Sequence, residues 1–261
     1  MNDQAMPDHP VLVRADNLVK HYKDRKRGVV EAVRGISFES CAGEIFGLLG
    51  PNGAGKTTTL RILATILKST SGTASIAGHD VVSDPDGVRR SLGFMSGDTG
   101  LYARLNAGEM VAYFGRLYGL EGDELNRRVE ETAEQLDMHD FFNRRCGKLS
   151  TGQKQKVSIA RTIVHNPPVL ILDEPTAGLD VLASRNIVSF VRNARQDGKC
   201  IILSTHDMGE AERMCDRIGI IHNGLLVAVD TKEGLFKRYD ATDLETVFLR
   251  AVGINEVEIG A

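Results

Sequence analysis

The sequence predicts an α/β fold in which helices cover a parallel sheet, with a small antiparallel β region and a helical insertion. From Val169 onward, short apolar runs alternate with amphipathic stretches, as strands alternate with helices in such folds. Residues 98–165, which precede this alternation, have a helix-forming composition. Several short β-like runs lie before them. A chain of 261 residues is long enough for one large domain with a subdomain.

A glycine-rich stretch joins an expected strand at 45–49 to an expected helix at 56–67. It reads GPNGAGKTT and fits G-x-x-x-x-G-K-[ST], the phosphate-binding loop. Glycines let consecutive backbone N–H groups turn toward phosphate oxygens, and the helix N-terminus adds partial positive charge. We expect Lys56 to reach the β- and γ-phosphates of a nucleotide and the Thr57 hydroxyl to ligate Mg²⁺. The candidate nucleotide-binding residues are Gly50, Pro51, Asn52, Gly53, Ala54, Gly55, Lys56, Thr57 and Thr58.

Bulk composition argues against several classes of protein. The net charge of −3 gives no basic excess of the kind that nucleic-acid-binding domains show. The four cysteines form no C-x-x-C pair, so neither a disulfide framework nor a zinc site is indicated, and reduced cytosolic thiols are expected. No apolar run approaches 18 residues, so we expect no bilayer-spanning helix. Residues 1–10 lack the features of a signal peptide and are expected to form a disordered tail.

The region before the insertion is expected to be mostly strands. Predicted strands cover 11–19, 29–33, 36–38, 71–76 and 92–95, and the basic run at 23–28 is interpreted as a solvated hairpin tip. In the insertion, Asn106 followed by Glu109 is a capping pattern that predicts a helix to Tyr118. Leu125 and Leu136 bound a second amphipathic helix.

The remaining elements follow in alternation. Expected strands are 169–172, 200–203, 217–221 and 225–229, and expected helices are 182–196, 208–215 and 243–252. We therefore divide the chain into a tail at 1–10, a domain that carries the phosphate loop at 11–240 and a helical extension at 241–261. Within the domain, the core would comprise 11–97 and 166–240, and the helical subdomain 98–165.

Two carboxylates follow the aliphatic run at 169–172. The carboxyl end of a buried parallel strand is where α/β sheets place their ligands. Asp173 is a candidate to hold Mg²⁺ through water, and Glu174 to orient or deprotonate an attacking water. The alternative is a strand followed by an ordinary acidic turn. The phosphate loop upstream favours the catalytic interpretation.

Two further stretches carry weaker signals. Ser150 opens a helix in the sequence LSTGQ and can be a simple N-cap, although a helix N-terminus of this kind also receives anions. His206 follows the expected strand at 200–203, where it is either a surface or core residue or a hydrogen-bond donor to a γ-phosphate.

Taken in order, the phosphate loop, LSTGQ, LILDEP and STH resemble the nucleotide-binding subunit of ABC (ATP-binding cassette) transporters. The resemblance extends from about Val11 to Val229. It implies a P-loop NTPase (RecA-like) core that binds and hydrolyses ATP with Mg²⁺. LSTGQ is similar to the family signature LSGGQ, and Ala177 to Asp180 matches the D-loop. Tyr22 matches the aromatic residue that stacks on adenine, although packing within a strand explains it nearly as well.

In that family, two subunits pair head to tail around two ATP molecules. The resemblance therefore implies that Ser150, Gly152 and Gln153 of one copy complete the site that Lys56 builds in another, with Asp180 at the same interface. It also implies a separate membrane permease that docks near residues 95–120, and a location on the inner face of the cell membrane.

The chain departs from the family pattern after Phe94, where most members carry a Gln that senses Mg²⁺ and the membrane partner. Ser96, Gly97 and Asp98 stand there instead, and Asp98 or a water is a candidate substitute. The stretch from Ser96 to Leu105, together with LSTGQKQKV, is similar to subunits of the sodium-extrusion and drug-resistance exporter group. A soluble ABC ATPase acting on DNA or ribosomes is the alternative, but such proteins usually need a long coiled coil, zinc motifs or two cassettes. A generic phosphate-loop kinase or GTPase does not account for LSTGQ.

Overall fold

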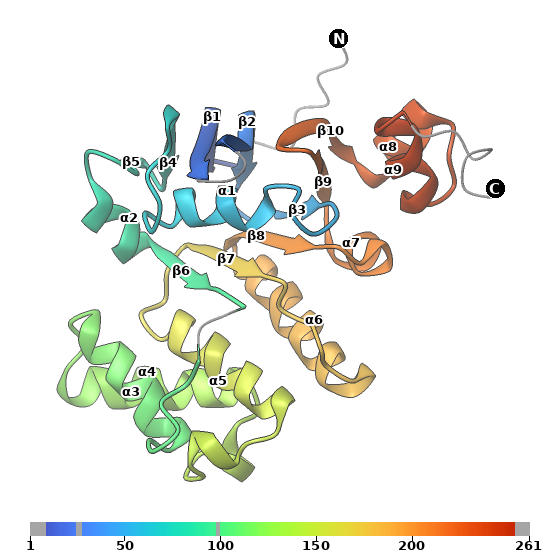
Figure 1. The fold of residues 1–261 in the computed structure, drawn as a ribbon. Helices are drawn as coiled ribbons and strands as arrows, with labels where there is room; N and C mark the ends of the chain where they lie inside the picture. The colour runs from blue at the N-terminus through green and yellow to red at the C-terminus, as the bar shows by residue number, and fades with distance from the viewer. Residues whose placement is uncertain (1–8, 25–27, 98–99, 254–261) are drawn as a thin grey trace.

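The computed structural model describes residues 9–24, 28–97 and 100–253, and two sheets organise them (Figure 1). The larger sheet has the strand order β10-β9-β3-β8-β7-β6, and β10 alone runs antiparallel to its neighbour. Its strands are β3 (Ile45–Leu49), β6 (Leu92–Met95), β7 (Val169–Asp173), β8 (Cys200–Thr205), β9 (Arg217–His222) and β10 (Leu225–Thr231). The parallel arrangement from β9 to β6 confirms the predicted α/β fold.

The smaller sheet is antiparallel, as predicted, with the order β2-β1-β4-β5. It comprises β1 (Val11–Asp24), β2 (Gly28–Cys41), β4 (Ser71–Ile76) and β5 (His79–Asp80). The separate strands expected at 29–33 and 36–38 are wrong, because both belong to β2. Register shifts along β1 and β2 let these two long strands bend without ending.

Nine α-helices lie in the described ranges, and Figure 1 shows how they group around the sheets. Near the smaller sheet are α1 (Lys56–Leu63) and α2 (Pro85–Ser91), and on the far side of the larger sheet are α3 (Ala107–Leu117), α4 (Gly122–Gln135), α5 (Thr151–Ile163) and α6 (Val181–Gln196). Helix α7 (Met208–Met214) packs beside β3 and β8. Beyond β10 are α8 (Lys232–Tyr239) and α9 (Leu244–Ala251). None of the described helices is long and apolar enough to cross a membrane.

The larger sheet separates two hydrophobic cores by the alternation of its side chains. In β7, Leu170 and Leu172 pack with α3, α4, α5 and α6, whereas Val169 and Ile171 pack with α1 and the smaller sheet. Successive strand residues point to opposite faces, so a strand buried on both faces is apolar throughout. The five residues of β7 are all buried. This anchoring fixes the position of the carboxylates at its carboxyl end.

Several expected boundaries differ from the structure. The first helix ends at Leu63 rather than 67, because Thr65 adopts a φ of 59°, which a helix cannot continue through. Helices α2 and α8 and strand β5 were not predicted. Of the expected tail, residues 1–8 lie outside the described ranges, and the carbonyl of Pro10 accepts a hydrogen bond from Ala42 N. Asp98 and the tip of the basic run at 25–27 also lie outside those ranges.

Candidate functional site

The phosphate loop leaves β3 and enters α1 at a place where only glycine fits. A Cβ on Gly50 would lie 2.2 Å from the carbonyl oxygen of Ile221, and one on Gly55 would lie 2.5 Å from that of Ala32. Gly55 also has a φ of 109°, which side chains with a Cβ rarely adopt. Residues 51–58 line a hollow of about 130 Å³ together with Ala32 and Glu174. All of the predicted loop residues except Gly50 thus line one cavity.

Lys56 lies under this loop with 5% of its surface exposed. Its Nζ donates to the carbonyl oxygens of Gly50 at 2.6 Å and Pro51 at 3.2 Å, and lies 3.8 Å from Glu174 Oε1. Burial lowers the pKa of Lys56, while the nearby Glu174 and Asp173 act in the opposite direction. A polyanionic ligand in the hollow would favour the charged form of this partly desolvated ammonium group.

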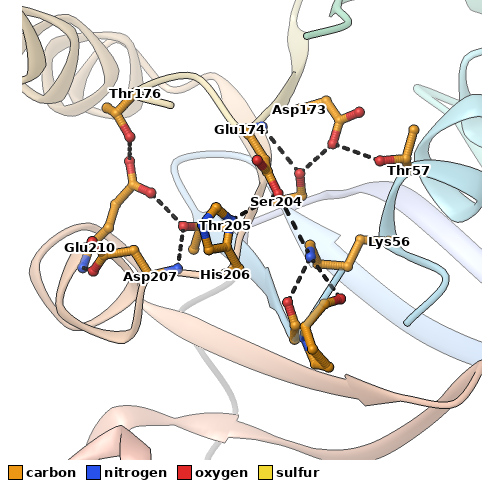
Figure 2. Close-up of polar contacts among 12 residues, drawn as sticks. Lys56, Thr57, Asp173, Glu174, Thr176, Ser204, Thr205, His206, Asp207 and Glu210 are labelled. Carbon is orange, nitrogen blue, oxygen red and sulfur yellow. Dashed lines mark hydrogen bonds and ion pairs between the residues drawn. The ribbon is translucent and has the colours of Figure 1, made fainter. Parts of the chain in front are cut away.

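Asp173 receives two hydroxyl groups at the end of β7, as Figure 2 shows. Its Oδ1 accepts hydrogen bonds from Ser204 Oγ at 2.5 Å and from Thr57 Oγ1 at 3.2 Å. Mg²⁺ prefers hydroxyl, carboxylate and water oxygens as ligands. Thr57 and Asp173 therefore present, side by side, the oxygen donors that suit Mg²⁺.

Glu174 adopts a left-handed backbone conformation with a φ of 50°. Its backbone N donates to the carbonyl oxygen and the hydroxyl of Ser204, both at 3.2 Å. Its Oε1 lies 3.1 Å from His206 Nδ1 and faces Lys56 from the other side (Figure 2). The structure thus gathers Lys56, Glu174 and His206 into one group, although they are far apart in the sequence.

The LSTGQ stretch lies at a second hollow, of about 600 Å³. This hollow is lined by Ser150, Gly152, Gln153 and Asp180, and among the described residues none lines both it and the phosphate-loop hollow. Ser150 and Gln153 form a reciprocal capping box at the start of α5. Since Ser150 Oγ accepts the hydrogen bond from Gln153 N, its own O–H proton remains available to a ligand. Capping and anion binding by Ser150 are therefore compatible.

Tyr22 lies on β1 opposite Val30, with 39% of its surface exposed. Lys20 Nζ sits 5.3 Å from the centroid of its ring. The residues that line the phosphate-loop hollow do not include Tyr22. Its contact with adenine stays a prediction.

Three residues of this region escaped the sequence reasoning. Ser204 holds Asp173 and Glu174, and a buried polar residue at the carboxyl end of a strand was the available signal. Gln155 Nε2 donates to the carbonyl oxygen of Pro175 at 2.5 Å, which ties α5 to the segment after Glu174. Glu210 accepts hydrogen bonds from Thr205 and Thr176. The contacts of Gln155 with Pro175 and of Glu210 with Thr176 join residues distant in the sequence, so no local pattern marks them.

Comparison with known proteins agrees with this geometry. The sequence model of the family described as ABC transporter matches residues 33–177. "ABC transporter ATP-binding protein NatA" of Bacillus subtilis (strain 168) is 39% identical over 91% of this chain and 97% of its own length. "Linearmycin resistance ATP-binding protein LnrL" of the same organism is 34% identical over 94% of this chain and 76% of its own length.

A solved structure is similar as well. It is a dimeric ATP-binding cassette in a post-hydrolysis state with ADP and Pi bound, and it is 28% identical with a TM-score of 0.76. The match covers 84% of this chain and 98% of the cassette. The P-loop NTPase fold, ATP binding and ATPase activity expected from the sequence are thereby confirmed. This chain belongs to the ABC transporter family and is an ATP-binding subunit of such a transporter.

Proposed function

We propose that this subunit powers an exporter by ATP-driven closure of a head-to-tail dimer, and that a separate membrane permease converts the closure into transport. The observation that carries the proposal is the group of Lys56, Glu174 and His206 at the phosphate loop, with Thr57 and Asp173 beside it. The name of the linearmycin resistance relative supports the outward direction, since resistance commonly requires removal of a drug from the cell.

The residues would divide the chemistry as follows. The backbone N–H groups of residues 50–58 and Lys56 hold the phosphates, and Thr57 and Asp173 hold Mg²⁺. The bound ion would neutralise charge on the β- and γ-phosphate oxygens. Glu174 orients or deprotonates the attacking water, and His206, 3.1 Å away, hydrogen-bonds the γ-phosphate. Tyr22 would stack on the adenine.

The second copy would supply the other side of the site. Ser150, Gly152, Gln153 and Asp180 line a hollow of their own in this chain, apart from the one at Lys56. Since one chain does not bring its own Ser150 to its phosphate loop, a second chain would be needed to enclose the nucleotide. The dimeric cassette with bound ADP and Pi supports such pairing.

The permease would dock beside the helical subdomain, residues 98–165. The core would comprise residues 11–97 and 166–240, and residues 241–261 would form an extension. Large apolar side chains are exposed there: Leu117 is 63% exposed, Tyr102 58% and Tyr113 39%. Exposed apolar groups that lie close together mark protein–protein contact sites. Through this contact the subunit would sit on the inner face of the cell membrane.

Replacing Glu174 tests the proposed chemistry. Glu174→Gln keeps the shape of the side chain and removes its ability to take a proton, so ATP binding should persist while turnover falls by about a hundredfold or more. ATP affinity is measured by titration with a fluorescent analogue, and turnover by phosphate release. Glu212→Gln, on α7 and bonded to Leu244 N, is the matched control and should keep the wild-type rate. Full turnover by Glu174→Gln would remove Glu174 from its proposed role.

A further inference from the structure

A buried carboxylate joins the two loops that carry Glu174 and His206. Glu210 lies in α7 with 5% of its surface exposed. Its Oε2 accepts a hydrogen bond from Thr205 Oγ1 at 2.5 Å, and its Oε1 accepts one from Thr176 Oγ1. Figure 2 shows Glu210 between these two threonines, on the side away from Lys56. The carboxylate has acceptor sites for both hydroxyls, which a single apolar side chain would leave unpaired.

The Thr205 contact fixes the turn that presents His206. Thr205 is the last residue of β8, and its hydroxyl also accepts a hydrogen bond from Asp207 N at 3.0 Å. Asp207 in turn accepts one from Glu210 N at 2.8 Å, which caps α7. His206 thus lies between two residues that are both hydrogen-bonded within this network.

The Thr176 contact fixes the segment that follows Glu174. Thr176 is two residues after Glu174, and its carbonyl oxygen accepts a hydrogen bond from Leu179 N at 3.1 Å. The same segment leads to Asp180, which caps α6. Glu210 therefore holds the backbone on both sides of the pair formed by Glu174 and His206.

The two side chains of that pair cannot be held by core packing. The side chain of His206 is 52% exposed and that of Glu174 28% exposed, yet they lie 3.1 Å apart. Their spacing depends on the backbones that carry them. We propose that Glu210 is a positioning residue that sets the spacing of Glu174 and His206 for ATP hydrolysis, an inference that rests on the proposed function of those two residues.

The test removes one hydrogen bond at a time. Glu210→Gln keeps the shape but replaces one acceptor oxygen with an amide N–H₂, so that one threonine hydroxyl must turn and accept. Thr176→Val and Thr205→Val each delete a hydroxyl at nearly constant volume. All three variants should lose about tenfold or more in kcat, because small displacements of catalytic groups have large effects on rate. ATP affinity, measured by direct titration, should change by no more than about twofold. Melting temperatures should fall by only a few degrees, because each variant leaves one buried hydrogen-bonding group without its partner.

A double variant and a control make the outcome decisive. Glu210→Gln with Thr176→Val should cost no more than the more damaging single change, because the two act through one link. Glu212→Gln, in the same helix but bonded to Leu244 N, should keep the wild-type rate. Wild-type kcat in Glu210→Gln and both valine variants would overturn the inference. So would equal losses of kcat and ATP affinity, which mark a purely structural role.

These results also separate the inference from the proposed function. If Glu174→Gln abolishes turnover while Glu210→Gln, Thr176→Val and Thr205→Val all behave like Glu212→Gln, only the positioning role fails. If the wild type does not hydrolyse ATP, or Glu174→Gln retains the full rate, the proposed function fails first. Because the two valine variants test the same link independently, misfolding of Glu210→Gln does not remove the test.

Discussion

The backbone of Glu174 adopts a left-handed conformation, which a residue with a Cβ seldom adopts. Its φ of 50° costs free energy that neighbouring contacts must offset. Ser204 accepts a hydrogen bond from the backbone N of Glu174. Gln155 donates one to the carbonyl oxygen of Pro175, and Glu210 accepts one from Thr176. These three contacts come from three different elements. The left-handed turn is therefore stabilised by the tertiary structure rather than by its own sequence.

At the scale of single residues, His165 predicts how the stability of the protein depends on pH. Its ring stacks on Tyr118 with centroids 3.6 Å apart, Nε2 lies 3.3 Å from the carbonyl oxygen of Leu92, and burial lowers the pKa to about 4. Between pH 6.5 and 4 the unfolded chain binds the proton that the folded chain rejects, so stability should fall as the pH falls through that window. His165→Phe keeps the stacking and cannot titrate.

Urea unfolding of both proteins at pH 7, 5.5 and 4.5 provides the measurement. The wild type should lose up to about 3 kcal/mol of unfolding free energy relative to His165→Phe across the window. Parallel pH profiles for the two proteins would show that this ring is not buried in its neutral form.

Single residues also show where sequence reasoning succeeds. Lys56, Thr57, Asp173, Glu174 and His206 were predicted to meet because parallel strands bring their carboxyl ends to one edge of a sheet, and the structure places them together. Glu210 and Gln155 were not predicted. Their hydrogen bonds depend on how a helix packs against a loop, which residue type and spacing do not encode. Tyr22 and the head-to-tail role of Ser150 stay predictions.

Helices and strands follow their local signals to different degrees. The capping pattern of Asn106 and Glu109 predicted α3, and the structure shows both bonds of the capping box. Asp84 before Pro85 was an equally good signal for α2 that went unused, and Thr231 caps α8 in the same way. The prediction ended β1 at Val19 and divided β2 into two strands, since a register shift leaves no clear mark in the alternation of residues.

The caps give an element-scale prediction. Asn106→Ala removes the side chain that accepts a hydrogen bond from Glu109 N, and it should lower the free energy of unfolding by about 1 kcal/mol. Glu121 precedes α4 without any side-chain capping bond, so Glu121→Ala is the matched control and should cost little. Denaturant titration of both variants is the measurement. An equal effect of the two substitutions would show that the capping box of α3 contributes nothing to stability.

At the scale of the whole molecule, the phosphate loop and the start of α5 face different hollows. Residues 51–58 line one, and Ser150, Gly152, Gln153 and Asp180 line the other. The two hollows are separated because the phosphate loop follows the carboxyl end of β3, whereas α5 and α6 pack in the core on one face of the larger sheet. Two copies related head to tail would join each loop to the other copy's Ser150. This arrangement explains why ATP would act as the ligand that closes the pair.

The most direct test is the mass of the Glu174→Gln variant in solution, measured by light scattering with and without Mg·ATP. Since this variant should bind ATP without hydrolysing it, ATP should shift the particle from the mass of one chain to that of two. Adding Ser150→Arg, which places a long side chain in the hollow lined by Ser150, should prevent the shift and leave ATP binding intact. ATP bound at one molecule per chain with no change from the single-chain mass would contradict the account.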